Sequence, residues 1–353
     1  MSNKSKIDSI KKILKQKGLN AIFLHFEHPS HFWLLEKKVE DSFIIIRQKG
    51  KPLIFKSILE GFSSKDFEVV NLKSRDVLKK KLSSMKIKNL GVDYKKFTYQ
   101  QKKFFPKTKI KDVGFELKNL RKIKNNYEKT CLRKANFLTA KCFNALIIEW
   151  KKKKFIHESQ AINFIKKFAI DKGCGLAFDP IVASGKNAAV PHHAENTKIF
   201  RGFCILDFGL DYKGYKADMT RTIFIGNPSR EEIKLYDELL SIQEYLLELC
   251  LPGTSCIEID KISRDLLGKK EKLFIHSLGH GTGVEIHELP NLSPESKDIL
   301  KEGMSITIEP GIYDKKKGYG IRIEDSLLIK RGFPENLTKK AKKSLIQLPL
   351  HNR

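Results

Sequence analysis

Four acidic side chains of this 353-residue chain lie in segments that otherwise have the pattern of apolar strands. A carboxylate in such surroundings is costly unless it is paired, hydrogen-bonded or bound to a cation. If the segments around 207 and 218 form one hairpin and those around 309 and 324 form another, the four carboxylates converge on one sheet surface. Like charges that close repel each other, and a divalent metal is the ordinary remedy. The candidate metal ligands are Asp207, Asp218, Glu309 and Glu324.

A glycine-rich segment, residues 276–288, adds histidines to this hypothesis. It contains His276, His280 and His287, and its glycines let the backbone come close to a bound group. Such a segment suits one metal ligand together with imidazoles that face a substrate. Four carboxylates and one histidine form a hard, oxygen-rich set, which suits two Mn²⁺ or Co²⁺ ions bridged by carboxylates better than a structural zinc ion. Zn²⁺ and Fe²⁺ are the alternatives at the same two sites.

Each of these signals taken alone has an ordinary structural explanation. A carboxylate in a strand is most often part of an ion pair, and Arg221 or Arg322 could pair with Asp218 or Glu324. A single histidine is more often a hydrogen-bonded core residue than a ligand. The glycines of residues 279–283 do not make a nucleotide loop, because the GxGxxG spacing and the P-loop lysine are missing. The metal hypothesis therefore depends on the order and spacing of all five residues together.

The net charge of +27, from 68 Lys+Arg against 41 Asp+Glu, raises the question of a polyanionic partner. Proteins that bind phosphate backbones concentrate their basic side chains on one face or groove. Here the basic runs at 79–81, 151–154 and 315–317 are short, separated and not interleaved with stacking aromatics. We interpret the charge as a solvated surface, and nucleic acid is not an expected partner.

The sequence also predicts the cellular setting. Apolar runs such as residues 43–46 are far shorter than the ~20 residues of a membrane helix, so no membrane contact is expected. The first residues are polar and lack the apolar region of a secretory signal. The six cysteines include no CxxC pair and have the pattern of buried thiols. We expect a cytoplasmic protein.

The length and the apolar pattern predict two domains of mixed α/β (α+β) class. Residues 1–118 alternate helical spacing with short apolar runs, such as 21–24 and 43–46, that read as buried strands. A second amphipathic pattern begins near Leu120, so the second domain is predicted to span 119–353. This domain contains a predicted hairpin over residues 203–225, helices over 231–251 and 257–267, and strands over 305–311 and 320–329.

The sequence motifs around these five residues resemble those of a known family. It is the pita-bread metallopeptidases, which include Xaa-Pro dipeptidase (prolidase), aminopeptidase P and methionine aminopeptidase. The matching motifs cover roughly residues 120 to 345, and the segment 182–193 places His192 where the family has a substrate-binding histidine. The resemblance implies a creatinase-like N-terminal domain over 1–118, followed by a pita-bread catalytic domain over 119–353. The matched motifs are Leu206-Asp207-Phe208-Gly209, Ala217-Asp218-Met219-Thr220-Arg221, Gly279-His280-Gly281-Thr282-Gly283, Glu309-Pro310-Gly311 and Arg322-Ile323-Glu324-Asp325.

The resemblance implies an exopeptidase with two divalent metal ions that hydrolyses the bond between an N-terminal residue and proline. By this resemblance, Asp207 holds one ion, Asp218 and Glu324 bridge both, and His280 and Glu309 complete the second. Glu309 is also the candidate general base. The remaining implied site residues are His192 and His287, which would hold the substrate, His276, which would line the pocket or donate to the intermediate, and Arg322, which would fix a carboxylate of the substrate or Asp218.

The expected substrates are short peptides with proline in the second position. The N-terminal domain favours the proline-specific branch, because methionine aminopeptidases usually lack it, and the intact ligand set argues against creatinase. Dipeptidase and aminopeptidase both stay open, with a slight lean to the dipeptidase. The family resemblance also implies a homodimer. The alternative function is a non-catalytic pita-bread protein that binds histones or RNA through its basic surface.

Overall fold

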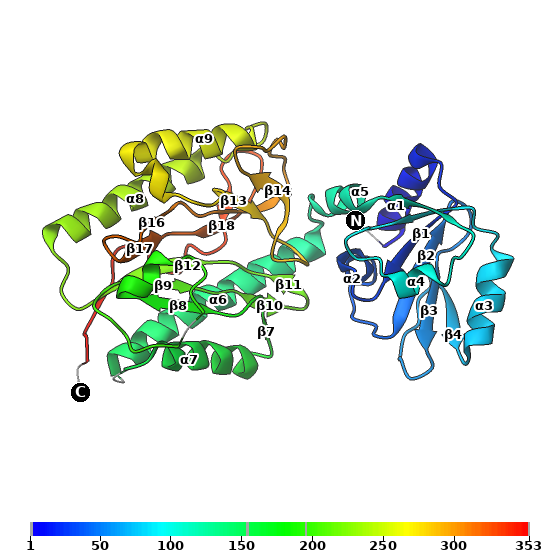
Figure 1. Cartoon of the computed structure of the whole chain (residues 1–353), viewed down its shortest axis with the longest axis horizontal. Coiled ribbons are helices and arrows are strands. Elements are labelled where there is room, and N and C mark those ends of the chain that lie inside the picture. Colours follow the sequence, from blue (N-terminus) through cyan, green and yellow to red (C-terminus); the bar gives the residue numbers. More distant parts are fainter. Residues whose placement is uncertain (1–2, 153–154, 195, 352–353) are drawn as a thin grey trace. The chain divides into compact units, whose positions relative to one another are not determined.

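The computed structural model describes residues 3–152, 155–194 and 196–351. The chain forms two compact units, Met1–Arg121 and Lys122–Arg353. Both units contain helices and strands (Figure 1). The division falls three residues after the boundary expected from the sequence at 118. In the part of the chain that the structure describes, no helix is both long and apolar enough to cross a membrane.

The first unit is built on a mixed six-stranded sheet with the order β4-β3-β2-β1-β5-β6. Strands β1, β2 and β3 pair antiparallel, whereas β4, β5 and β6 join in parallel. The predicted strands at 21–24 and 43–46 are confirmed, and their apolar side chains are buried. The elements are α1 (Asn3–Lys17), β1 (Ala21–His25), α2 (Pro29–Leu35), β2 (Ser42–Arg47), β3 (Leu53–Ser57), β4 (Glu68–Leu72), α3 (Arg75–Ser84), β5 (Asn89–Val92), α4 (Tyr99–Lys102), β6 (Lys109–Asp112) and α5 (Gly114–Arg121).

The second unit contains longer helices and several small sheets. Its helices are α6 (Asn126–Lys152), α7 (Glu158–Asp171), α8 (Arg230–Glu248) and α9 (Cys256–Leu267), with short 3₁₀ helices η1 (Gly185–Ala189) and η2 (Gly268–Leu273). Its strands are β7 (Gly175–Leu176), β8 (Ile181–Ser184), β9 (Gly202–Asp207), β10 (Leu210–Tyr212), β11 (Tyr215–Lys216), β12 (Thr220–Ile225), β13 (Gly279–Gly281), β14 (Glu288–Leu292), β15 (Ser305–Ile308), β16 (Gly311–Asp314), β17 (Tyr319–Arg322), β18 (Asp325–Leu328), β19 (Glu335–Asn336) and β20 (Gln347–Leu348).

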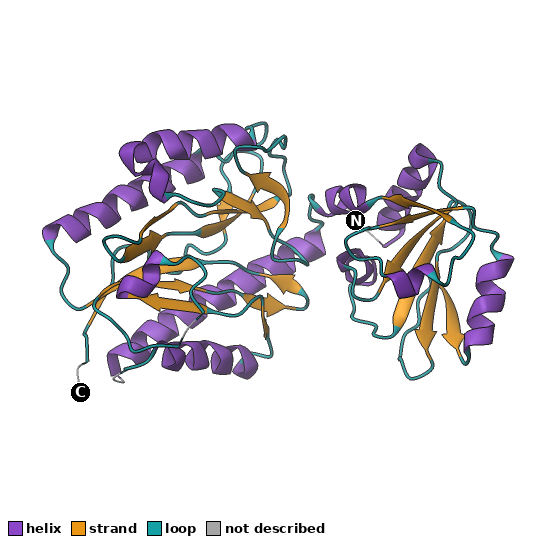
Figure 2. Ribbon diagram, viewed as in Figure 1, coloured by secondary structure: helices purple, strands orange, loops and turns teal. Residues whose placement is uncertain are grey.

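Two helix pairs enclose the strands of this second unit (Figure 2). Helices α6 and α7 pack on the sheet β20-β12-β9-β8, and α8 and α9 cover the sheet β14-β13-β15-β18-β19. Strand β9 contributes to both cores, because successive side chains of a strand point to opposite faces. Cys204 and Leu206 join the core under α6 and α7, whereas Phe203 joins the core under α8 and α9.

The predicted hairpin over 203–225 is present as β9 paired antiparallel with β12, with Asp207 opposite Thr220. The predicted strands over 305–311 and 320–329 are each interrupted. Strand β15 pairs with β18, and the inserted β16 pairs with β17 in a separate two-stranded sheet. Glu309 and Glu324 therefore lie at the breaks between strands, and Pro310, which has no N–H for a ladder, follows the first of them.

The backbone at these breaks is tied to neighbouring segments. The amide of Glu309 donates to the carbonyl of Leu278, and the amide of Glu324 donates to the carbonyl of Thr220, at 2.9 and 3.1 Å. These hydrogen bonds give each amide an acceptor at a position where the strand ladder is interrupted. They also bring Glu309 next to β13 and Glu324 next to β12, so carboxylates far apart in the sequence become neighbours.

Candidate metal centre and active site

A cavity of about 580 Å³ in the second unit is lined by all nine site residues predicted from the sequence. A larger groove of about 780 Å³ beside α8 contains no histidine, so the smaller cavity is the better candidate for metal chemistry. The nine are Asp207, Asp218, Glu309, Glu324, His192, His276, His280, His287 and Arg322. The other lining residues are Phe178, Asp179, Ile181, Pro191, Ser277, Gly279, Ile286 and Asn291.

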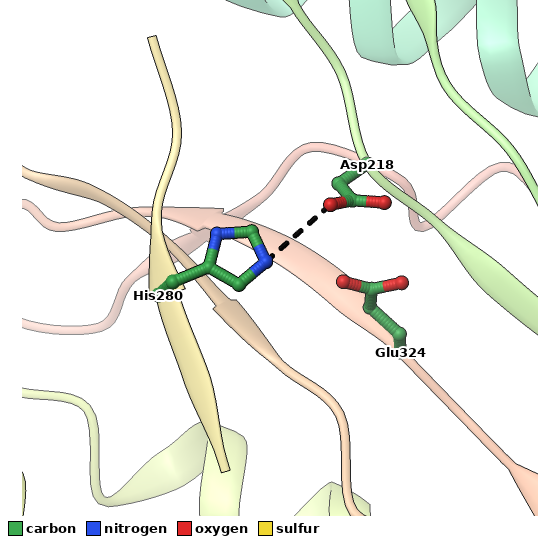
Figure 3. Close-up of side chains that lie close together, drawn as sticks. All are labelled: Asp218, His280 and Glu324. Atoms are coloured by element: carbon green, nitrogen blue, oxygen red, sulfur yellow. Dashed lines mark ion pairs between the residues drawn. The ribbon is translucent and has the colours of Figure 1, made fainter. Parts of the chain in front are cut away.

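Three of the five predicted ligands form a tight cluster at this cavity. One ligand atom from each of Asp218, His280 and Glu324 lies within 4.8 Å of the others. His280 belongs to β13, Asp218 precedes β12, and Glu324 precedes β18; Figure 3 shows their side chains facing one another. His280 Nε2 is 3.5 Å from Asp218 Oδ2 and 3.4 Å from Glu309 Oε1, so the fourth side chain borders the cluster.

The surroundings of His280 prepare its ring for metal binding. Burial, followed by repulsion from His287, lowers the pKa of His280 to about 3, so the imidazole is neutral. Its Nδ1 lies 3.1 Å from the carbonyl oxygen of Gly281, which can only accept and therefore fixes the proton on Nδ1. The unprotonated Nε2 then faces the carboxylates, which is the arrangement of a ligating histidine.

The carboxylates carry more negative charge than the protein around them neutralises. Burial, together with repulsion from Asp207 and Glu309, raises the pKa of Asp218 well above its usual range. Burial and repulsion from Asp218 do the same to the pKa of Glu324. Burial, with repulsion from Asp207, raises the pKa of Glu309 to about 8. A nearby cation stabilises the ionised form of such buried, mutually repelling carboxylates.

Arg322 has a different partner from those considered in the sequence analysis. Its NH2 lies 2.5 Å from Asp207 Oδ2, and its Nε donates to Thr220 Oγ1 at 3.1 Å. The other arginine considered there, Arg221, pairs with Asp325 at 2.6 Å. Neither arginine therefore has Asp218 or Glu324 as its ion-pair partner, because the strand breaks turn those carboxylates toward His280 instead.

The three other predicted histidines line the same cavity but differ in burial and hydrogen bonding. Burial lowers the pKa of His276 to about 4, and its ring nitrogens lie 2.8 Å from the Ser277 carbonyl and 2.9 Å from Tyr313 Oη. The Ser277 carbonyl takes the only N–H of this neutral ring, so none is left to donate to a substrate. His192 and His287 are exposed at the cavity, and burial of part of the His287 ring lowers its pKa.

The residues present fit divalent metal ions. Among the described residues, Asp207 Oδ1 and Glu324 Oε1 are buried without a hydrogen-bond donor. A buried carboxylate oxygen without a donor is costly, and a cation would supply the missing interaction. Carboxylate oxygens and one imidazole nitrogen form the hard donor set that Mn²⁺, Co²⁺ and similar ions accept.

Three supporting residues were not given a role in the sequence analysis. Thr220 Oγ1 donates to Glu324 Oε2 at 2.9 Å, and Thr307 Oγ1 donates to Glu309 Oε1 at 3.3 Å. Tyr313 Oη accepts from Arg322 at 2.6 Å and contacts His276. For the two threonines, the available signal was a position two residues from a carboxylate in an otherwise apolar strand, since a buried hydroxyl there needs a polar partner.

Comparison with known proteins agrees with this chemistry. The model of metallopeptidase family M24 matches residues 130–331. A Pyrococcus horikoshii Xaa-Pro dipeptidase is 32% identical over 345 residues, covering 94% of this chain and 97% of that protein. A solved Xaa-Pro dipeptidase from Bacillus anthracis superposes with a TM-score of 0.90 at 28% identity, covering 98% of this chain and 100% of the other. A solved X-Pro aminopeptidase from Thermotoga maritima gives 0.83 at 28% identity, with coverages of 94% and 98%.

The fold and the site thus define a metallopeptidase, a hydrolase that uses divalent metal ions. The chain belongs to metallopeptidase family M24. The family predicted from the sequence motifs and the predicted mixed α/β fold class are both confirmed.

Proposed function

We propose that this protein is an exopeptidase that hydrolyses the peptide bond between an N-terminal residue and proline. The observation that carries the proposal is the cluster of Asp218, His280 and Glu324 at a cavity that holds all nine predicted site residues. Relatives named Xaa-Pro dipeptidase and X-Pro aminopeptidase match nearly the whole chain, which supports the proline-directed substrate. Their names favour the enzyme over a non-catalytic protein that binds histones or RNA.

The metal ions would be held by Asp207, Asp218, His280, Glu309 and Glu324. Once bound, two divalent ions supply Lewis-acid polarisation of the scissile carbonyl and lower the pKa of a water molecule. The hard donor set favours Mn²⁺ or Co²⁺, with Zn²⁺ or Fe²⁺ as alternatives. Replacement of His280 with alanine is expected to lose metal and activity together, and an unchanged metal stoichiometry would overturn this ligand assignment.

Side chains of this protein would transfer the proton and keep the carboxylates oriented. Glu309 borders the cluster and is the proposed general base. It would accept a proton from the attacking water and return it to the proline nitrogen as the C–N bond breaks. Thr307 holds the Glu309 carboxylate, and Arg322 holds Asp207, so both carboxylates keep their orientation during the reaction.

The exposed histidines at the cavity are the proposed substrate contacts. A peptide bond before proline has no N–H, so recognition depends on the shape of the ring and on the neighbouring carbonyl and carboxylate groups. His192 and His287 line the same cavity as the metal cluster. We assign them to the scissile carbonyl and to the carboxylate side of proline. Arg322 is already engaged by Asp207, so a direct contact with the substrate carboxylate is the weaker of its two proposed roles.

The decisive experiment incubates purified protein with Mn²⁺ or Co²⁺ and either Ala-Pro or a longer peptide that begins Ala-Pro. Release of alanine from both substrates supports an aminopeptidase, and release from Ala-Pro alone supports a dipeptidase. Failure of the fully metal-loaded protein to cleave either peptide, with binding of histones or RNA in moderate salt, would overturn the proposal. The homodimer and the cytoplasmic location stay predictions from the sequence.

A further inference from the structure

Glu158 is a fully buried acidic residue that the proposed reaction does not use. It is the first residue of α7, and its side chain has 0% exposure. It does not line the cavity, yet among the described residues the groups that bond its carboxylate all belong to residues 184–197, the segment that carries His192. A buried carboxylate is tolerated only when several donors satisfy it.

The donors around Glu158 are numerous and come from both halves of that segment. Oε1 accepts from the backbone amide of Ser184 at 2.7 Å, from its hydroxyl at 2.8 Å and from Asn187 Nδ2 at 3.0 Å. Oε2 lies 3.2 Å from His193 Nε2 and 3.2 Å from Thr197 Oγ1. Hydrogen bonds to an ionised acceptor are roughly twice as strong as those between neutral groups. One carboxylate thus joins residues that precede and follow His192.

The two adjacent histidines of this segment have different surroundings. The side chain of His193 is only 7% exposed and turns toward Glu158. His192 is exposed and lines the cavity. The amide of His193 donates to the carbonyl of Val190 at 3.1 Å, which closes a turn around Pro191 and His192. Anchoring one histidine inward therefore fixes the direction of its neighbour.

We infer that Glu158 is a positioning residue that holds His192 in place for substrate binding and catalysis. The inference rests on the proposed function, because it gives His192 a substrate to hold. In Glu158→Gln, the negative charge is lost and one oxygen becomes an NH₂ group that can no longer accept, so the bonds that hold the segment are weakened. A displacement of about 1 Å at a group that contacts substrate can lower the rate up to ~100-fold. We expect kcat/KM for Ala-Pro to fall on the order of 10-fold.

A double-mutant cycle separates positioning from a general loss of stability. The four proteins are the wild type, Glu158→Gln, His192→Ala and the double variant, all loaded with Mn²⁺. If Glu158 acts through His192, Glu158→Gln lowers kcat/KM about 10-fold in the wild type but less than about 2-fold once His192 is absent. Equal effects of Glu158→Gln in both backgrounds would overturn the inference.

A second readout does not depend on activity. Hydrogen–deuterium exchange of residues 184–194 is expected to accelerate in Glu158→Gln, while metal stoichiometry stays at the wild-type value. His193→Leu, which removes one partner and leaves the buried charge satisfied by the others, is expected to accelerate exchange in the same segment to a smaller extent. The matched control is Glu335→Gln, a carboxylate of the same unit that pairs with Arg133 outside the cavity.

The outcomes distinguish this inference from the proposed function. A wild type that cleaves no Xaa-Pro peptide removes the proposed function, while faster exchange in residues 184–194 of both Glu158→Gln and His193→Leu still establishes Glu158 as the anchor of the segment. Exchange in that segment that stays at the wild-type rate in both variants overturns the inference. So does an equal acceleration in Glu335→Gln.

Discussion

At the residue scale, the polar neighbours of the carboxylates matter as much as the carboxylates. Thr220 donates to Glu324 and accepts from Arg322, so one hydroxyl links a proposed bridging ligand to the arginine that holds Asp207. Loss of such a supporting bond typically weakens metal binding or activity about 10–100-fold, because the ligand is no longer oriented. The site is thus a network in which a threonine has a measurable role.

Replacement of Thr220 with valine tests this role. The substitution keeps the shape and removes the hydroxyl, so Mn²⁺ affinity measured by titration calorimetry is expected to fall on the order of 10-fold. Thr222→Val is the matched control, because Thr222 lies on the same strand and its hydroxyl bonds the backbone carbonyl and amide of Arg322. Equal losses of affinity in the two variants would contradict a specific role for Thr220.

A second prediction at this scale concerns Glu335 and pH. The hydrogen bonds from Arg133 lower the pKa of Glu335 to about 2 from an ordinary value of 4.5. Its folded-state pKa is depressed, so the stabilisation is fully present above pH ~4.5 and is lost as the pH falls toward 2. The wild type should exceed Glu335→Gln in unfolding free energy by about 1 kcal/mol at neutral pH, since the pair is partly exposed.

Denaturant unfolding of both proteins between pH 6 and pH 2.5 measures this difference. The difference in unfolding free energy between the wild type and Glu335→Gln is expected to disappear as the pH falls from 4.5 toward 2. A gap that stays constant over the whole range would mean that the Arg133 pair is not its source.

At the scale of elements, the connection from β13 to β14 carries His287 and depends on a buried ion pair. Lys124 Nζ lies 2.8 Å from Glu288 Oε2, and both side chains are only 2% exposed. The other carboxylate oxygen of Glu288 accepts from the amide of Glu285 at 3.3 Å. A Cβ at Gly283 would lie 2.4 Å from this carboxylate, so the connection folds closely around it. The ion pair therefore anchors the connection that presents His287.

Replacement of Lys124 with methionine should destabilise the protein strongly. Removal of one partner of a buried pair typically costs 3–5 kcal/mol, which is about the loss we expect, because the buried Glu288 carboxylate loses the positive charge of Lys124. The double variant Lys124→Met/Glu288→Leu removes both charges and should recover much of that loss. Urea unfolding measures both effects, and a double variant less stable than Lys124→Met would contradict the assignment.

The sequence predicted individual elements better than their connections. Helical spacing predicted helices over 231–251 and 257–267, and the structure has α8 at Arg230–Glu248 and α9 at Cys256–Leu267. The Ser229 and Glu232 capping box that starts α8 is a local signal that a sequence displays. The strand breaks at Glu309 and Glu324 were not predicted, because a single apolar run does not reveal that the chain changes sheets.

The proposed site shows the same difference. Its nine residues could be proposed from the sequence because buried acids and histidines are conspicuous and matched the motifs of a family. Their supporting contacts could not, because they join segments far apart: Thr220 and Glu324 are separated by 104 residues, and Glu158 and His193 by 35. Such pairs depend on which strands become neighbours, and hydrophobic periodicity carries no information about that pairing.

At the scale of the whole molecule, the two units should respond differently to metal. All five proposed ligands belong to Lys122–Arg353 and none to Met1–Arg121. A ligand that binds only the folded state stabilises it by about 2.7 kcal/mol at 100 times its dissociation constant. For a unit of this size, each kcal/mol raises the midpoint by ~2–4 °C, so Mn²⁺ should raise the transition of the second unit by roughly 5–10 °C. The first unit has no proposed ligand through which to gain this energy.

Calorimetry of the full chain, with and without Mn²⁺, tests this prediction, and hydrogen exchange in β1 and β9 assigns each transition to its unit. We expect β9 to become more protected on metal binding and β1 to keep its exchange rate. His280→Ala is the control that should abolish the shift, because it removes the one neutral nitrogen ligand from the cluster. An undiminished shift in His280→Ala would place the metal elsewhere. An equal shift of both units would mean that they unfold as one cooperative body, so that energy gained at the carboxylates also stabilises the sheet of the first unit.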